Sequence, residues 1–148
     1  MLRKPFFTLF ATLVCAWSLG QYSQDAVKNL RGSLREAPDS SIGKIYNKIF
    51  TEFYSHSVFD SAMAAAREAM NKARQIKDRR FESTAMVWQG MVEFERGNHD
   101  KALPIYLEAL KIKEEINDPK GEAGLMVNMA GIYYEQNHPE KAIEIYLK

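Results

Sequence analysis

The chain resembles itself at a spacing of 40 residues, and this internal repetition constrains its fold more than any other feature. Shifting the sequence by 40 positions aligns Asp60-Ser61-Ala62 with Asp100-Lys101-Ala102. A second step of the same size aligns Lys101-Ala102-Leu103 with Lys141-Ala142-Ile143. A fixed period of this size is typical of stacked supersecondary units, each of which buries its apolar face against the next. We therefore expect an array that binds through a surface.

Composition favours an all-α class for these units. The chain is 46% hydrophobic and 26% charged, which suits a continuous core beneath a solvated exterior. Helix-forming residues predominate, and no segment alternates convincingly with period two, as a half-buried strand would. A formal net charge of +1 indicates no basic tract, so no nucleic-acid partner is predicted for this segment.

The first twenty residues follow a different pattern. Arg3 and Lys4 precede an uncharged, apolar run over 5–19, and the small residues Ser18 and Gly20 stand two apart at its end. This order is typical of a secretory signal peptide. The run is shorter than the roughly twenty residues of a spanning helix. The pattern predicts an exported protein, periplasmic or secreted, with an uncleaved N-terminal membrane tether as the alternative.

Cysteine usage agrees with this prediction. Cys15 is the single cysteine and lies inside the apolar run, preceded by Val14, whereas a lipoprotein signal would place a small residue there. Cleavage after Gly20 would leave a mature chain without any thiol. Helical packing alone is then expected to hold the exported protein together.

Residues 21–42 are expected to form an N-terminal capping helix and a linker. Pro38 interrupts the helical pattern, and Ser40 or Ser41 is expected to cap the next helix. The terminal unit of an array needs such a cover because it has no neighbour on that side. The apolar residues at helical spacing in this segment are Ala26, Val27, Leu30 and Leu34.

Each following unit reads as a helical hairpin. In the middle unit we expect helix A from about Phe81 to Arg96 and helix B from about Asp100 to Ile116, joined by Gly97-Asn98-His99. Gly97 can adopt a left-handed conformation after a helix, and the Asp100 carboxylate can meet free amides at the next N-terminus. The expected units are a degenerate repeat 1 at 43–82, repeat 2 at 83–122 and an incomplete repeat 3 at 123–148.

These hairpins resemble the tetratricopeptide repeat. The stretch from Gly90 to Leu103, followed by Tyr106 and Ala109, is one match, and the stretch from Ala130 to Ala142 with Tyr146 is another. The resemblance implies a right-handed solenoid of antiparallel helix pairs that binds proteins or peptides. Small side chains let adjacent helices approach and large ones fill the remaining space. The implied packing residues are Ala62, Ala69, Gly90, Ala102, Tyr106, Ala109, Ala130, Ala142 and Tyr146.

The first unit departs from this pattern in two places. Phe50 stands where the later units have a small residue, and Ala66 stands where they have a large aromatic one. An N-terminal unit that packs on an atypical cap is expected to deviate.

The 40-residue period and the leader are together similar to the sensor halves of exported, repeat-containing histidine kinases and LuxR-type regulators of Bacteroidetes. Because repeat 3 stops at Lys148 before its helix B is complete, we expect a truncated chain. In the signalling-protein alternative, a missing C-terminal segment would carry the output domain, and a membrane tether would lie either in that segment or in the uncleaved N-terminus. The alternatives left open are an exported binding scaffold, the sensory portion of such a signalling protein, and an accessory protein of cell-envelope assembly.

In this family helix A forms the concave face, and its positions define a candidate peptide groove. The aromatic series Tyr54, Phe94 and Tyr134 would form a stripe for a peptide, unless the rings pack between neighbouring helices instead. Glu95 and Glu135 could favour a basic ligand. The other groove candidates are Asn47, Thr51, Val87, Met91, Val127 and Gly131.

No pattern in the chain indicates catalysis. A phosphate-binding loop, a nucleophile elbow and a desolvated pair of carboxylates are all missing from the sequence, so we expect neither an enzyme nor a cofactor. His56, His99 and His138 fall at or near turns without ligand-spaced partners, so no metal site is predicted and all three are expected to be solvated. The predicted partner is a protein or a peptide.

Overall fold

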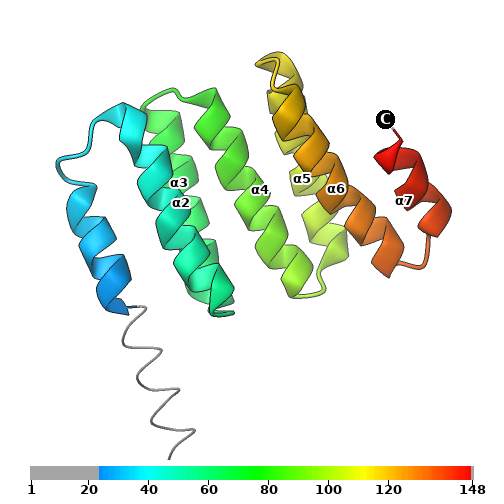
Figure 1. The fold of residues 1–148 in the computed structure, drawn as a ribbon, viewed down its shortest axis with the longest axis horizontal. Helices are drawn as coiled ribbons and strands as arrows, with labels where there is room; N and C mark the ends of the chain where they lie inside the picture. The colour runs from blue at the N-terminus through cyan, green and yellow to red at the C-terminus, as the bar shows by residue number, and fades with distance from the viewer. Residues whose placement is uncertain (1–23, 148) are drawn as a thin grey trace, which may run out of the picture.

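The computed structural model describes residues 24–147 and consists of helices throughout that range (Figure 1). The predicted signal peptide and its cleavage site lie outside the described residues. A helical segment at 24–33 comes first. The helices that follow are α2 (Asp39–Ser55), α3 (Phe59–Gln75), α4 (Arg79–Glu95), α5 (His99–Glu115), α6 (Pro119–Glu135) and α7 (Pro139–Tyr146).

Helices α2 to α7 are evenly spaced because the same type of turn joins each of them to the next. Helices α2 to α6 each contain 17 residues, and three residues separate each from the next. After α4, for example, Asn98 N–H donates to Glu93 O at 2.9 Å and Gly97 N–H donates to Phe94 O at 2.8 Å. This pair of bonds is the Schellman motif. The central residues, all with positive φ, are Ser57 (57°), Lys77 (57°), Gly97 (73°), Asn117 (51°) and Asn137 (60°).

Several predicted helix ends differ from the observed ones. Helix α2 begins at Asp39 after Pro38, and neither Ser40 nor Ser41 caps it, because the extended backbone of Pro38 already starts the first turn. His99 is the first residue of α5 and not part of the preceding turn. Asp100 lies within the first turn of α5, where its carboxylate faces the positive end of the helix dipole.

The hairpins are also offset from the predicted units. They span 39–75, 79–115 and 119–146, so each begins four residues before the expected boundary at 43, 83 or 123. The boundaries at 43, 83 and 123 follow from the small residues that recur every 40 positions, and they leave the first helical turn of each hairpin with the preceding unit.

Two layers make up the solenoid. Helices α2, α4 and α6 lie side by side in one layer, with α3 and α5 behind them (Figure 1). Each helix packs against its neighbours in the chain, and α4 also contacts both α2 and α6. The fold is therefore the predicted all-α solenoid of helical hairpins.

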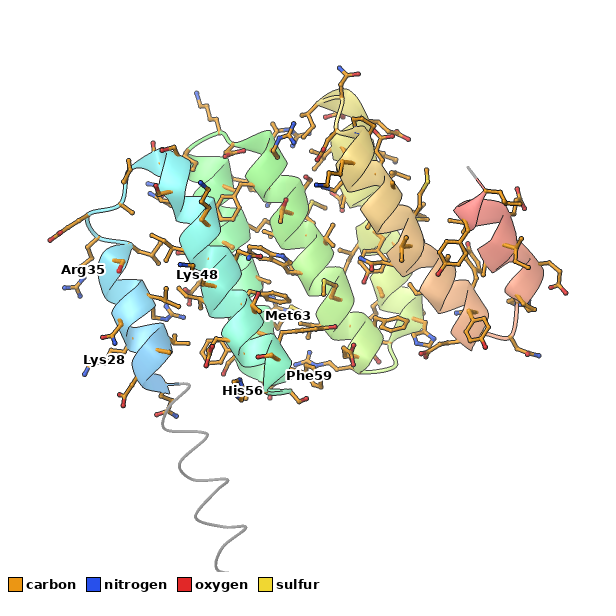
Figure 2. All side chains as sticks on the ribbon, in the orientation of Figure 1. Lys28, Arg35, Lys48, His56, Phe59 and Met63 are labelled. Atoms are coloured by element: carbon orange, nitrogen blue, oxygen red, sulfur yellow. The ribbon has the colours of Figure 1, made fainter. Side chains whose placement is uncertain are left out.

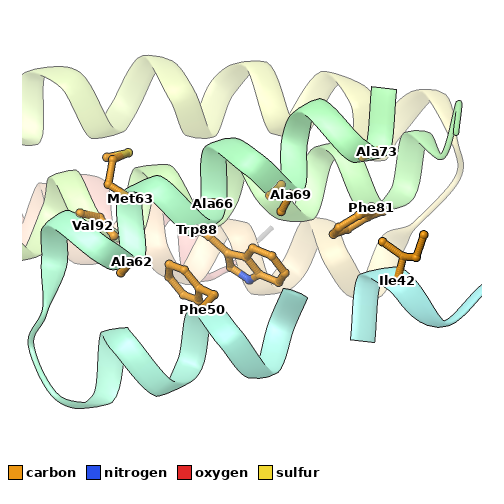
Figure 3. Close-up of a cluster of buried hydrophobic side chains, with 11 residues drawn as sticks. Ile42, Phe50, Ala62, Met63, Ala66, Ala69, Ala73, Phe81, Trp88 and Val92 are labelled. Atoms are coloured by element: carbon orange, nitrogen blue, oxygen red, sulfur yellow. The ribbon is translucent and has the colours of Figure 1, made fainter. Parts of the chain in front are cut away.

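An aromatic cluster joins the first two hairpins. The rings of Phe50 and Trp88 stack with centroids 5.0 Å apart, and Phe81 meets Trp88 edge-on at 6.2 Å (Figure 3). The α3 helix lines this cluster with alanines because larger side chains would keep its backbone away from the rings. These fully buried alanines are Ala62, Ala66, Ala69 and Ala73.

Unit 1 and unit 2 exchange large and small side chains at equivalent places. In unit 2, Gly90 on α4 faces the buried ring of Tyr106 on α5. In unit 1, the buried ring belongs to Phe50 on α2, and Ala66 on α3 is the small residue. The space between the two helices is filled from opposite sides, so the departure of unit 1 from the repeat pattern preserves its packing.

The helical segment 24–33 packs along the outer side of the first hairpin, against α2 and α3. Val27 is buried in a cluster with Ile49 of α2 and Ala65 of α3. Arg31 donates two hydrogen bonds to the Glu68 carboxylate of α3, at 2.8 and 3.1 Å. The first hairpin thus has neighbours on both sides. Between residues 24 and 147, no helix is both long enough and apolar enough to cross a membrane.

Candidate functional site

All candidate groove residues lie on α2, α4 and α6, the helices of one layer, but their exposure differs. On α2, Asn47 and Thr51 are exposed. On α4 the corresponding Val87 and Met91 are half-buried. On α6, Val127 is 51% exposed and Gly131 is half-buried. The surface of this layer therefore changes from polar at α2 to apolar at α6.

The Tyr54 side chain forms a hydrogen bond that links the first two units. Its hydroxyl donates to Glu95 Oε1 at 2.8 Å, and its ring stacks on Phe50 with centroids 5.3 Å apart. Burial raises the pKa of the Tyr54 hydroxyl well above its usual value, and the hydrogen bond to the Glu95 carboxylate raises that pKa further. Glu95, a candidate for contacting a basic ligand, already accepts this hydrogen bond.

A histidine takes the equivalent place between the second and third units. Phe94 has no hydroxyl, and the His99 ring stacks on it with centroids 5.2 Å apart. His99 Nε2 lies 3.3 Å from Glu135 Oε2, and the His99 side chain is only 18% exposed. The prediction that His99 is solvated was therefore wrong, while His56 and His138 are exposed. The sequence signal for this contact was Phe94 itself, which lacks the hydroxyl that Tyr54 carries at the same position of the preceding repeat.

The third aromatic residue has different surroundings. Tyr134 is 70% exposed, whereas Tyr54 and Phe94 are half-buried in contacts between units. Opposite Phe94, a Cβ atom on Gly131 would lie 3.9 Å from the Phe94 ring, in ordinary contact. Of the aromatic series, Tyr134 is the member with most of its ring open to solvent.

A cleft of about 490 Å³ opens between α2 and α4, and of its lining residues only Asn47 was among the candidate groove residues. Lys48, one of the missed residues, is labelled on α2 in Figure 2. Lys44 and Lys48 stand one helical turn apart, and this i, i+4 spacing was the signal that could have been noticed. The lining residues are Asp39, Ser40, Gly43, Lys44, Asn47, Lys48, Asp78, Arg80, Phe81, Thr84 and Trp88.

Gly43 lets α2 pack closely on Phe81 at one wall of this cleft. A Cβ atom at Gly43 would lie 3.3 Å from Phe81 Cδ2, closer than most side-chain contacts. Phe81 and Trp88 are each 6% exposed and belong to the aromatic cluster, so they form a firm apolar floor. Exposed lysines above an apolar floor can hold a ligand that carries both an apolar group and negative charge.

Two other charged side chains at the cleft, those of Asp78 and Arg80, have internal roles. The Asp78 carboxylate accepts the backbone N–H of Phe81 at 2.9 Å and caps α4. Arg80 Nη1 lies 3.2 Å from Asp118 Oδ1. Across residues 24–147, no three His, Cys, Asp or Glu side chains gather in a way that could hold a metal ion.

Comparison with known proteins agrees with this architecture. A family model described as tetratricopeptide repeat matches residues 81–148. This stretch carries tetratricopeptide repeats. The matched stretch contains the α4–α5 hairpin and the α6–α7 hairpin. No curated protein sequence matches the chain.

Two solved structures share this fold at low sequence identity. The TPR domain of Arabidopsis FLU is 21% identical, with a TM-score of 0.64 over 74% of this chain and 92% of that one. BtubC (BKLC) from P. vanneervenii is also 21% identical, with a TM-score of 0.68 over 86% of this chain and 52% of that one. Because the second structure covers 86% of the chain, the structural likeness extends beyond the residues that the tetratricopeptide repeat (TPR) model matches.

Proposed function

We propose that this chain is a TPR scaffold that binds a protein or an extended peptide on the layer formed by α2, α4 and α6. TPR repeats generally serve protein interactions, and the fold is typically a non-catalytic scaffold. The cleft between α2 and α4 is the observation that carries the proposal, because it is a concave site on this layer with an apolar floor. Val127 and Tyr134 continue the layer as exposed apolar side chains on α6.

A random 12-residue peptide library displayed on phage, selected against the full chain, tests this proposal. The variant Val127→Asp with Tyr134→Ala removes apolar surface from α6 and should weaken retention of the selected peptides. Leu107→Asp is the matched control, because Leu107 is 43% exposed and lies on α5 in the other layer. Equal loss from both variants, or loss only from Leu107→Asp, would place binding elsewhere.

We propose in addition that the protein is exported. The basic, apolar and small-residue order of the first twenty residues supports this location. N-terminal sequencing of the protein recovered from the periplasm or the medium tests the proposal, and a start at Gln21 is expected. Recovery of the uncleaved chain only from the cytoplasm would contradict it.

A further inference from the structure

We propose that the N-terminal end of the solenoid docks on a membrane surface that carries anionic phospholipids, through a basic notch on the helical segment 24–33. This notch is a cavity of about 480 Å³ whose walls combine cationic and apolar side chains. It shares no lining residue with the cleft between α2 and α4, so the inference goes beyond the proposed function. The walls of the notch include Val27, Lys28, Arg31, Gly32, Arg35 and Phe53.

The cationic side chains share one face of the segment because of their spacing. Lys28, Arg31 and Arg35 stand three and four positions apart, as neighbours on a helical face do. Arg35 belongs to the turn that ends the segment, and its backbone N–H donates to Gly32 O at 3.3 Å, which continues this face. Figure 2 shows Lys28 and Arg35 at the outer edge of the molecule.

Lys28 and Arg35 are the uncompensated charges of the notch. Both are exposed, and among the described residues 24–147 neither forms a salt bridge. Arg31 differs, because it donates two hydrogen bonds to the Glu68 carboxylate and its charge is thereby neutralised. That pair holds the segment on α3 and leaves two cations for a ligand.

Nearby acidic side chains do not cancel these two cations. Asp25 and Glu36 of the same segment are exposed but do not line the notch. Neither of them forms a salt bridge with a cation of the notch. On α2, Glu52 Oε1 lies 3.9 Å from His56 Nδ1. An anion that enters the notch therefore meets net positive charge.

Gly32 opens the space between the two free cations. It stands one helical turn after Lys28 and three residues before Arg35, and no heavy atom lies within 4 Å of a Cβ atom built on it. Val27, which is buried, and Phe53, which is half-buried, supply an apolar wall. A phosphate can approach both cations here while the glycerol or acyl part of a lipid meets apolar carbon.

These features suit a lipid surface better than a small soluble anion. Two exposed ion pairs hold an isolated anion weakly, because water and salt screen them. A surface of anionic headgroups presents many phosphates at once, and each basic side chain near it strengthens binding roughly fivefold. The apolar run over 5–19 ends shortly before the segment, so a chain that keeps its leader would hold the notch close to a membrane.

Partitioning of the full chain onto vesicles tests the proposal. Vesicles of equimolar phosphatidylglycerol and phosphatidylcholine are compared with pure phosphatidylcholine, and the ratio of the two partition coefficients removes the contribution of the apolar run. We expect the wild type to prefer the anionic vesicles. Lys28→Gln with Arg35→Gln should reduce this preference about 25-fold at low salt. Lys101→Gln with Lys111→Gln, at exposed positions of α5, is the matched control and should leave it unchanged.

Gly32→Gln distinguishes the notch from general attraction between charges. The substitution changes no charge and has open space around it, so the fold should be kept while the notch is filled. It should lower the preference for anionic vesicles toward that of Lys28→Gln with Arg35→Gln. A preference as strong as in the wild type would overturn the notch.

Three further outcomes would also overturn the inference. One is equal partitioning of the wild-type chain onto both kinds of vesicle. Another is an equal loss of preference in the Lys101→Gln and Lys111→Gln control. The third is release from anionic vesicles by glycerol phosphate at the same phosphate concentration, which would indicate a site for soluble phosphate esters.

Discussion

Gly90 on α4 and Tyr106 on α5 are in such close contact that a Cβ atom on Gly90 would lie 2.3 Å from Tyr106 Cε1 and 2.6 Å from Cδ1. Tyr106 is 1% exposed and packs in a cluster that includes Leu125 and Met129 of α6. Its ring cannot withdraw without disturbing the next unit. The contact therefore couples the packing within unit 2 to the packing between units 2 and 3.

Gly90→Ala is expected to destabilise the protein by roughly 1–3 kcal/mol, because overpacking exceeds the gain in helix propensity. Urea denaturation followed by circular dichroism measures the change. Gly124→Ala is the control within α6, since no heavy atom lies within 4 Å of its added Cβ. That substitution should stabilise the protein by about 0.5–1 kcal/mol. Similar changes from both variants would be inconsistent with the steric argument.

The exchange of Phe50 and Ala66 predicts non-additive substitutions. Phe50→Ala should leave a cavity and cost about 3–5 kcal/mol, and Ala66→Tyr should overpack the wild-type core at a cost of roughly 1–3 kcal/mol. Combined, they should cost clearly less than the sum, because the new ring enters the emptied space. A double-mutant cycle from urea denaturation measures this coupling. Strict additivity would show that the two side chains do not fill one space.

The hydrogen bond from Tyr54 to Glu95 should contribute measurably to the contact between units 1 and 2. Tyr54→Phe removes only the hydroxyl and is expected to lower the free energy of unfolding by about 1 kcal/mol. Tyr134→Phe is the matched control, because this ring is 70% exposed on α6. Thermal unfolding of both variants compares them. An unchanged melting temperature for Tyr54→Phe would mean that the hydrogen bond to Glu95 adds nothing to the stability of this contact.

Glu82 makes stability depend on acid pH. Burial raises the pKa of its carboxyl, but hydrogen bonds from Arg74 at 2.7 Å and Arg79 at 2.8 Å outweigh burial and hold the pKa below its usual value. Because the folded pKa is the lower one, this contribution is present above the unfolded value and is lost as the pH falls through the folded value. Stability should therefore decline below about pH 4.5.

Glu82→Gln is expected to cost roughly 1–2 kcal/mol at pH 7 and to flatten this acid dependence. Urea denaturation at pH 7 and pH 3 measures both effects. Glu108→Gln, at an exposed position of α5, is the control and should change neither. An acid dependence as steep in Glu82→Gln as in the wild type would assign the effect to other carboxylates.

Unit boundaries were only partly predictable, because the turns carry a weak sequence signal. Gly97 indicated a left-handed residue after a helix, but the same conformation at Ser57 and Lys77 occurs in residues that do not favour it. These turns are held by backbone hydrogen bonds and by the packing of the helices they join. Sequence patterns therefore located the hairpins but displaced their ends.

The candidate site was less predictable than the fold because it depends on contacts between units. Tyr54 and Glu95 lie about one repeat apart in the sequence and become hydrogen-bonded only because α2 and α4 lie side by side. His99 looked like a turn residue until its ring was found on Phe94. The cleft likewise needs the floor from α4 and the lysines from α2.

The sequence by itself determined the all-α hairpin array, because helical periodicity and a repeated unit are local properties that can be read along the chain. The tertiary structure decided which side chains remain free to bind. Lys44, Lys48 and Tyr134 are exposed, whereas Glu95 and His99 are engaged between units. Exposure and pairing depend on how neighbouring hairpins stack, and residues one repeat apart meet only through that stacking.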